Sequence, residues 1–569
     1  MRYGRIRTTI LTTVASLWTC YALADTQPTI DELNSIDAGR ITIDKNIPGL
    51  EENRDLQFDL PKSETLISAP EAAKKIEFIL KTVEIDGLTA FKPEEIAEYY
   101  DDKINTKISL AFAWDLAASI TTKYREAGYF LSRAYVPQQN IKNGNLVIKI
   151  VEGRVGIVEV EGELRENRII KKYIDRLRES GPSKVAKLES FLLRVNDIPG
   201  VSYRSVFSPT TKDENDQQSA TLTLVPTNDK KTSGSISVDN FSSRFTGPQQ
   251  VSLNYEASLI ALNKTSAAIS SSIEPGHLTY GEVRHSILVA PDINVGITAS
   301  ATETSPGYTL KKYDLKSRAN YFDLNLNYQF IRQRQTNLSF KLSVDSLDVK
   351  SNMMGNTILT RDHVRAVRAG ANYSLTDKWK GSTSANITIS QGIDGFGASK
   401  QNAPYVSRPE AKPTFTKGLV VLSRIQDVSK DFEVLASTQG QISSGVLYFS
   451  EQIGYGGQAF GRAYDSSDIS GNSGLKGLFE VRYKGYDLSD KFNLYPYSFY
   501  DVGAVWNSSV GSPKKQSGAS AGAGIRFHSK WNQTGYLAVA FPLTKDIATP
   551  IYGSGKRTPR FTFQLSHSF

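Results

Sequence analysis

The feature that most constrains the fold of this chain is an alternation of apolar and polar side chains over about its last three-fifths, from about Lys231 to Phe569. Side chains of a β-strand point to opposite faces in turn, so this pattern predicts strands with one apolar and one polar face. It recurs in the segments 251–259, 322–330 and 338–344. A sheet of such strands fits either a soluble β-sandwich or a transmembrane β-barrel with lipid outside and water inside.

The N-terminus favours the barrel. Three arginines precede a short apolar stretch, residues 8–23, and a small-x-small cleavage motif follows. This is the pattern of a secretory signal peptide, which we place at residues 1–24. The arginines are Arg2, Arg5 and Arg7, and the cleavage motif is Ala22-Leu23-Ala24. We therefore expect an exported mature chain.

The C-terminus gives a second argument for a membrane barrel. The last strand alternates again and ends on an aromatic side chain, with Phe561, Phe563, Leu565 and Phe569 on its apolar positions. About 340 residues are left for the barrel, and at about 10 residues per span plus a similar allowance for connections they form near 16 strands. The predicted fold class is therefore α+β periplasmic modules followed by an all-β transmembrane barrel of about sixteen antiparallel strands at residues 230–569.

Composition and missing motifs narrow the function. After the N-terminus no apolar run is long enough for a transmembrane helix. Three charges of the net +8 lie in the leader, and no dense basic stripe remains, so nucleic acid is not an expected partner. The only cysteine, Cys20, lies in the leader, and the five histidines are scattered. Without a nucleophile elbow, a Walker loop or a dinucleotide fingerprint, we expect no enzyme, no metal and no cofactor.

Residues 25–76 form a small N-terminal unit. Thr29 and Glu32 have the spacing of a capping box, and the apolar residues that follow predict one short helix that ends near Gly39. The segment from there to Pro70 is polar and contains three prolines, which is typical of a linker. Two interpretations fit this unit: a frayed terminus, or a detachable plug on a tether.

Two modules of similar pattern follow, at residues 77–153 and 154–229. In the first, the sequence predicts a strand over 78–85, a short helix from Pro93, a longer helix capped by Ser109 and ended by Gly128, and two strands. The second repeats this β-α-α-β-β order. Such units expose the edges of their sheets, and an open edge can accept an extended guest strand through main-chain hydrogen bonds.

The stretch 453–474 is too rich in glycine and short polar residues for a helix or a strand interior, so it predicts a long loop. It carries one cation, Arg462, between the aromatic residues Phe460 and Tyr464. A surface loop with an incidental arginine is one interpretation, and composition alone favours it because arginine is usually exposed. The other is a loop folded into the lumen of the barrel.

Several strings of this sequence resemble one family, the two-partner secretion transporters of the Omp85 superfamily, also known as haemolysin secretion/activation proteins. The turn Asn196–Gly200 is similar to one in the family's second polypeptide-transport-associated (POTRA) domain. Two further strings are similar to the family's first POTRA domain. They are Val151-Glu152-Gly153 and Gly128-Tyr129-Phe130-Leu131-Ser132-Arg133-Ala134-Tyr135-Val136-Pro137-Gln138-Gln139. The resemblance implies secretion of a large partner exoprotein of the haemolysin or adhesin type, and its activation as a further role.

The resemblance also implies site residues. Gly461-Arg462-Ala463-Tyr464 stands where the family has Val-Arg-Gly-Tyr or Val-Arg-Gly-Phe, with Gly461 and Ala463 as the departures. The family places this loop inside the barrel and pairs its arginine with an aspartate on the inner wall. The matching strand here covers 497–506. Its alternation puts Asp501 and Gly503 on the lumenal face, because a carboxylate would not face lipid.

The expected partners follow from the same resemblance. They are a secreted exoprotein with an N-terminal secretion domain, outer-membrane lipid, the barrel assembly machinery that reads the final strand, and periplasmic chaperones. The expected location is the outer membrane of a Gram-negative bacterium, as a multi-pass protein with its POTRA domains in the periplasm. The alternatives are a barrel assembly factor of the same superfamily, which carries more modules than two, and a passive porin, which needs none. An enzyme is a distant third class.

Overall fold

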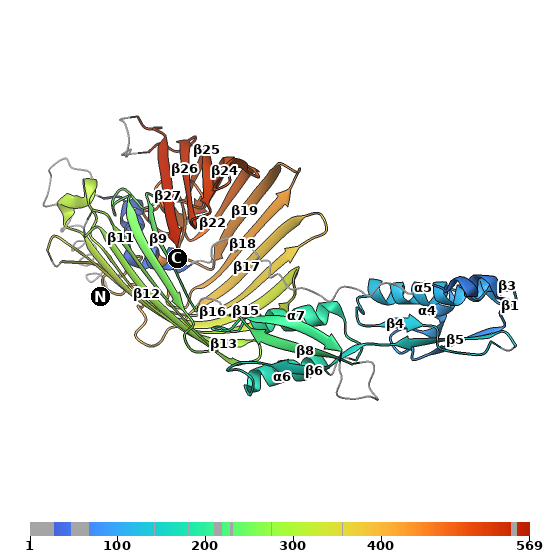
Figure 1. The fold of residues 1–569 in the computed structure, drawn as a ribbon. Coiled ribbons are helices and arrows are strands. Elements are labelled where there is room, and N and C mark those ends of the chain that lie inside the picture. Colours follow the sequence, from blue (N-terminus) through green and yellow to red (C-terminus); the bar gives the residue numbers. More distant parts are fainter. Residues whose placement is uncertain are drawn as a thin grey trace, which may run out of the picture.

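The computed structural model describes residues 28–46, 68–141, 143–178, 181–209, 219–227, 231–274, 276–355, 357–547 and 555–569. The predicted leader, with Cys20 and the cleavage residues Ala22 and Ala24, lies outside these residues, as does most of the predicted linker. Figure 1 shows a large barrel from which two small α+β modules extend in a row. This arrangement confirms the predicted fold class.

Sixteen antiparallel strands of the described chain close the barrel, which confirms the predicted number. A short strand β23 (Tyr486–Ser489) forms a hairpin with β24, and the first strand pairs with the last, for example Val238 with Leu565. The strands are β9 (Thr232–Asp239), β10 (Gln250–Ala257), β11 (Asn263–Ser272), β12 (Leu278–Ala290), β13 (Ile293–Thr304), β14 (Lys316–Arg332), β15 (Thr336–Met353), β16 (Thr357–Thr376), β17 (Gly381–Gly392), β18 (Thr416–Asp427), β19 (Phe432–Ser443), β22 (Ser473–Tyr483), β24 (Phe492–Trp506), β25 (Lys515–Ser529), β26 (Gln533–Pro542) and β27 (Arg560–Ser568).

The two faces of the wall follow the alternation in the sequence. In β14 the apolar residues Phe322, Leu324 and Leu326 are exposed on the outside, whereas Asp323 between them is buried. The outward residues have no protein to pack against, so their burial requires lipid. The inward face is mainly polar, and where segments inside the barrel lie against it, it also carries apolar residues such as Val349.

The first module holds a three-stranded sheet in the order β2 (Thr82–Asp86), β5 (Asn145–Val151), β4 (Arg133–Tyr135). Its helices are α4 (Pro93–Ala97), α5 (Phe112–Glu126) and the short turns η1 (Glu71–Lys75) and η2 (Asp101–Lys103). The helix α5 buries an apolar stripe against β5, which forms the core of the module. Gly128 follows α5 with φ +87°, a conformation that favours glycine at the end of a helix.

Two predictions within the first module are wrong. The single strand over 78–85 is two strands, β1 (Glu77–Ile79) and β2, because the chain changes partner between them: Leu80 N–H donates to Thr106 O and Lys81 N–H to Gly144 O. Ser109 does not cap α5. It belongs to β3 (Lys107–Ser109), where it pairs with Glu77, and α5 starts after Ala111 without a side-chain cap.

The second module repeats the order of the first. Its sheet runs β6 (Arg154–Val160), β8 (Ser219–Pro226), β7 (Tyr203–Pro209), and the helices α6 (Arg168–Arg178) and α7 (Val185–Asn196) cover one face. In the two three-stranded sheets, β2 and β6 are parallel to the central strand, and β4 and β7 are antiparallel to it. The domain boundaries given above stay predictions.

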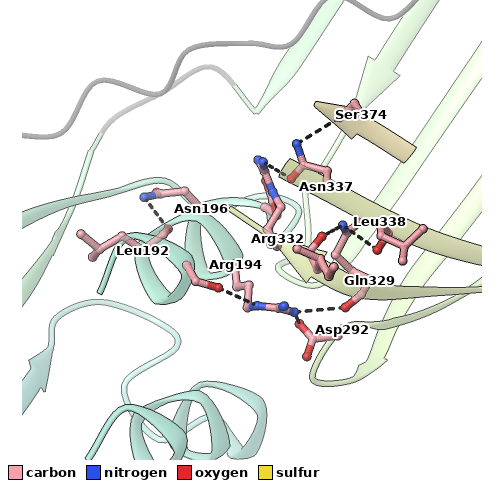
Figure 2. A network of polar contacts seen from close by, with 12 residues as sticks. Leu192, Arg194, Asn196, Asp292, Gln329, Arg332, Asn337, Leu338 and Ser374 are labelled. Carbon is pink, nitrogen blue, oxygen red and sulfur yellow. Dashed lines mark hydrogen bonds and ion pairs between the residues drawn. The ribbon is translucent and has the colours of Figure 1, made fainter. Parts of the chain in front are cut away.

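The second module rests on turns at one rim of the barrel. Arg194 of α7 pairs with Asp292 in the turn between β12 and β13 and donates to the carbonyl oxygen of Gln329 at 3.2 Å (Figure 2). Its guanidinium also donates to the carbonyl oxygen of Phe330 at 3.2 Å. Asp292 further accepts hydrogen bonds from Tyr173 at 3.0 Å and Arg176 at 2.7 Å. The module is therefore held to the barrel by a cluster of charged contacts.

The N-terminal unit contains two helices, α2 (Ile30–Ser35) and α3 (Ala38–Asn46), which lie within the barrel as the blue ribbon of Figure 1 (we call them the plug helices). The predicted capping box of Thr29 and Glu32 is present. The predicted stop at Gly39 is wrong. Asp37 accepts the N–H of Arg40 at 3.0 Å and so starts a second helix, in which Gly39 is the second residue.

Gly39 has a packing role instead. A Cβ there would lie 2.4 Å from Cγ2 of Val349 on β15, so the glycine allows α3 to approach the wall closely. The hydroxyl groups of Thr42 and Thr302 lie 2.6 Å apart across the same interface. Among the described helices, none combines the length and the apolar character needed to cross a membrane.

Candidate functional site

The chain between β19 and β22, residues 444–472, lies inside the barrel, and we call it the lumenal segment. It contains the turn η4 (Phe449–Glu451) and a two-stranded hairpin of β20 (Ile453–Tyr455) and β21 (Ile469–Gly471). The prediction of an irregular loop over 453–474 is therefore wrong at its ends. Ile453 and Tyr455 pair with Gly471 and Ile469 through the main chain, and β22 already begins at Ser473.

Arg462 lies at the far end of this hairpin and contacts Asp501 on β24. Its Nε donates to Oδ2 at 3.2 Å and its Nη2 to Oδ1 at 3.1 Å, a two-pronged contact. The main-chain N–H groups of Gly461 and Arg462 donate to the same Oδ2 at 3.2 and 3.0 Å. Asp501 is fully buried and Arg462 is 6% exposed. Charge-assisted, two-pronged hydrogen bonds fix orientation as well as distance.

Glu480 on β22 is a second acceptor that the sequence analysis missed. It accepts from Nη1 of Arg462 at 2.9 Å and forms ion pairs with Arg482 and Arg526, both at 2.6 Å. Its position between the outward residues Phe479 and Val481 is the signal that could have revealed it as lumenal. Two buried carboxylates and three guanidinium groups thus form one network between the lumenal segment and the wall.

Aromatic rings cover this network. The ring centroid of Phe499 lies 3.6 Å from Cζ of Arg462, and the ring of Tyr497 lies 4.0 Å from Cζ of Arg526. Cations are attracted to aromatic faces at these distances. Because the rings also exclude water from the ion pairs, they weaken the screening of the charges.

Gly503 makes room for the lumenal segment, although the neighbour is not Arg462. A Cβ at Gly503 would lie 2.3 Å from the ring of Tyr455, and one at Gly518 on β25 would lie 2.7 Å from the same ring. Two glycines on adjacent strands therefore form the seat of Tyr455, whose side chain is almost fully buried.

The rest of the predicted motif is also buried in the lumen. Tyr464 donates its hydroxyl hydrogen to Ala519 O at 2.9 Å, and Ala463 is 1% exposed. Gly461 has φ +80°, and a Cβ there would lie 2.8 Å from the ring of Tyr455. Glycine at this position thus fits a local backbone that a valine would adopt only with strain.

A second ion cluster follows the motif, and the sequence analysis did not predict it. Asp465 pairs with Arg244 and with Arg560, the latter at 3.2 Å. Arg560, the first residue of β27, also donates to Tyr464 O at 2.6 Å. The motif is therefore tied to β27 and to the connection between β9 and β10, on the two sides of the seam where β27 meets β9.

The final strand places its apolar residues as predicted from the alternation. Phe561, Leu565 and Phe569 are exposed on the outside, and Phe563 is half-buried. Phe569 pairs with Gly234 through two main-chain hydrogen bonds of 2.9 and 3.0 Å. The role of this strand as an assembly signal stays a prediction.

Comparison with known proteins decides the family. Residues 218–527, more than half of the chain, match the model for haemolysin secretion/activation protein ShlB/FhaC/HecB. The chain belongs to this family. Residues 78–153 of this transporter match a second model, the POTRA domain of the ShlB type, which is the first module described above.

The relatives agree with this family. The transporter is 23% identical over 473 residues to the heme/hemopexin transporter protein HuxB of Haemophilus influenzae (strain 86-028NP), covering 80% of this chain and 81% of the relative. It is 21% identical to the outer membrane transporter CdiB of Dickeya dadantii (strain 3937), covering 85% and 87%. The solved structure of CdiB from Escherichia coli has the same fold, with a TM-score of 0.67 at 18% identity over 89% and 94% of the two chains.

These findings settle the class of the protein. It is a two-partner secretion transporter of the Omp85 superfamily, located in the outer membrane with its POTRA domains in the periplasm. It exports a partner exoprotein. The turns at the POTRA-bearing rim of the barrel are therefore periplasmic, and the lumenal segment enters the barrel from the cell surface.

Proposed function

We propose that the structure is the closed state of the transporter, in which the plug helices and the lumenal segment together block the pore, and that the Arg462–Asp501 contact holds the lumenal segment in place. The exported partner is a large exoprotein of the haemolysin or adhesin type with an N-terminal secretion domain. Export proceeds without ATP hydrolysis by this chain. The partner passes outward after the plug helices have left the barrel.

One observation carries this proposal: the two lumenal elements contact each other as well as the wall. Asn34 of α2 donates to Gln452 at 2.6 Å, and Arg40 of α3 donates to the carbonyl oxygen of Phe449 at 3.3 Å. Ser467 donates to Asp44 at 3.1 Å. A polypeptide cannot thread through this volume until at least one element moves, so secretion requires an opening step.

Capture of the partner involves the POTRA sheets. Each has two edge strands, β2 and β4 in the first domain and β6 and β7 in the second. An extended segment of the partner's secretion domain would add to one of these edges through main-chain hydrogen bonds. Because the second POTRA domain is fixed to the periplasmic turns, a partner bound there is already next to the entrance of the barrel.

The test is secretion by transporters altered at Arg462. Arg462→Ala should leave the barrel folded, as judged by its heat-modifiable mobility in gels, and should impair export of the exoprotein. Arg462→Lys should be impaired as well, since an ammonium cannot make the two-pronged contact with Asp501. Arg165→Ala, an exposed arginine of the second POTRA domain, is the matched control. Normal export by a fully inserted Arg462→Ala protein would refute the role of this contact.

A further inference from the structure

Glu451, in η4 at the beginning of the lumenal segment, has no exposed surface and contacts a sector of the wall remote from Asp501 in the sequence. Its carboxylate accepts from Nη2 of Arg368 on β16 at 2.8 Å and from Nη1 at 3.2 Å. Nζ of Lys417 on β18 lies 2.6 Å from the second oxygen. One buried carboxylate therefore binds two cations from two strands.

The main chain of Glu451 is held as well. Its carbonyl oxygen accepts hydrogen bonds from Lys417 and from Gln441, which is on β19, both at 3.0 Å. Arg368 is itself oriented by Asp345 on β15, with 2.6 and 3.0 Å between the paired atoms. It also donates to Ser390 on β17 at 2.9 Å. Five consecutive strands, β15 to β19, thus contribute to a site that receives a single residue of the lumenal segment.

We propose that Glu451 is a second positioning residue of the transporter, which anchors the lumenal segment to the β15–β19 wall independently of the Arg462 anchor on β22 and β24. The inference rests on the proposal above that the lumenal segment closes the pore. The segment is then fixed near its beginning and at the tip of its hairpin, and opening requires both anchors to break.

The charges of the site explain why this anchor can release without unfolding the barrel. Arg368 keeps Asp345 as its partner on the wall when Glu451 leaves, so one guanidinium stays compensated. Lys417 alone loses its carboxylate, and its side chain then faces a lumen that water or a passing polypeptide fills. Hydration of one ammonium group limits the cost of opening, whereas removal of Arg368 would leave Asp345 buried without a partner.

The anchor also contacts the plug helices through its neighbour. The carbonyl oxygen of Phe449, two residues before Glu451, accepts the hydrogen bond from Arg40. A Cβ at Gly454 would lie 2.3 Å from Nη2 of Arg40, so this guanidinium fits closely against the start of the hairpin. Loss of the Glu451 anchor should therefore loosen α3 as well, whereas loss of the Arg462 anchor leaves these contacts of Arg40 in place and should affect α3 less.

The experiment uses the full-length transporter in planar lipid bilayers. Glu451→Gln keeps the shape of the side chain and removes its charge, and it should raise the frequency of open-channel events on the order of tenfold. Glu451→Gln/Arg462→Ala should raise it by about the product of the two single effects, because independent contributions multiply. Glu303→Gln, which removes an exposed ion pair with Arg318 on the same barrel, is the control and should behave as wild type.

A second variant separates anchoring from a general effect of buried charge. Glu451→Gln/Lys417→Met restores charge balance at the site but not the contacts to the carboxylate. Anchoring predicts that this double variant stays as open as Glu451→Gln, while a return to wild-type closure would overturn the proposal. A disulfide between cysteines at Thr42 and Thr302 reports the seat of α3, and Glu451→Gln should lower its yield more than Arg462→Ala does.

The outcomes also separate this inference from the proposed function. If Arg462→Ala opens the channel and Glu451→Gln does not, only the second anchor is refuted. If neither variant changes the openings of a folded barrel, the lumenal segment does not close the pore, and both proposals fail. Channels that open in Glu451→Gln but not in Arg462→Ala would support the Glu451 anchor and refute the role given to Arg462.

Discussion

Arg194 of the second POTRA domain forms an ion pair with Asp292, in the turn between β12 and β13, and this pair joins the periplasmic part of the transporter to its barrel. Asp292 adopts φ +68° and is buried, and its N–H donates to the hydroxyl of Tyr173 at 2.8 Å. A short turn of the barrel therefore serves as the binding site for a whole domain.

Asp292→Ala should loosen this junction. It leaves Tyr173, Arg176 and Arg194 without their shared acceptor, and we expect a loss of about 1–3 kcal/mol in docking free energy. Asp292→Asn is the matched control, because asparagine tolerates a positive φ and retains an acceptor oxygen. Distances between spin labels on α7 and on the barrel rim should broaden in the alanine variant, and an unchanged distribution would contradict the prediction.

Gly503→Ala should unseat the lumenal segment without touching its charges. The added Cβ would lie 2.3 Å from the ring of Tyr455, and such overpacking costs about 1–3 kcal/mol. We expect impaired closure in bilayer recordings and reduced secretion. Tyr455→Ala removes the ring that the new Cβ would meet. The effect of Gly503→Ala on closure should therefore be smaller in the Tyr455→Ala background than in the wild type. A folded Gly503→Ala protein with wild-type conductance would argue against the seat.

Acid should destabilise the first POTRA domain through Glu152. Burial raises the pKa of this carboxyl, but hydrogen bonds from Thr89, Tyr124 and the N–H groups of Thr89 and Ala90 outweigh burial and lower it. A pKa that is lower in the folded state contributes stability above the ordinary pKa of glutamate, about 4.3. That stability is lost as the pH falls from there through the lowered value.

The measurement is urea unfolding of the full chain at pH values from 7 down to about 3. Trp379, Trp506 and Trp531 of the barrel are replaced by phenylalanine, so that the fluorescence reports Trp114 in α5. Glu152→Gln should lower the unfolding free energy at neutral pH by about 1–3 kcal/mol. It should also make the unfolding free energy depend less steeply on pH in the acid range. Glu126→Gln, at the end of the same helix, is the control. An equally steep dependence on pH in Glu152→Gln would show that other groups cause it.

Deletion of residues 77–228 tests whether the POTRA domains recognise the exoprotein while the barrel forms the pore. The barrel closes through its own strands, β9 to β27, so we expect it to insert and to pass small solutes under conditions that open the wild type. Export of the exoprotein should be abolished, because the edges that capture it are gone. Export by the truncated transporter would assign recognition to the barrel instead.

The sequence predicted the barrel because the faces of a strand are a local property. The alternation of residues such as Phe322 and Asp323 determines which side chains face the lumen and which face lipid. The number of strands follows from the length of the alternating region. The resemblance to the family added the two POTRA domains and brought Arg462 and Asp501 to attention. These features depend on neighbours in sequence or on whole motifs, so a single chain reveals them.

What the sequence missed depends on which strands meet once the barrel closes. Glu480 and Glu451 are single acids in unremarkable surroundings, and Arg526 and Arg368, which pair with them, lie on other strands far from them in the sequence. From the sequence, Gly39 predicts the end of a helix. In the structure it lies within α3, where a Cβ would collide with Val349 of the wall. The alternation determined which side chains face the lumen, and only closure of the sheet around the lumenal segment decided which of them pair, because desolvated charges take whichever partner the closed wall brings within reach.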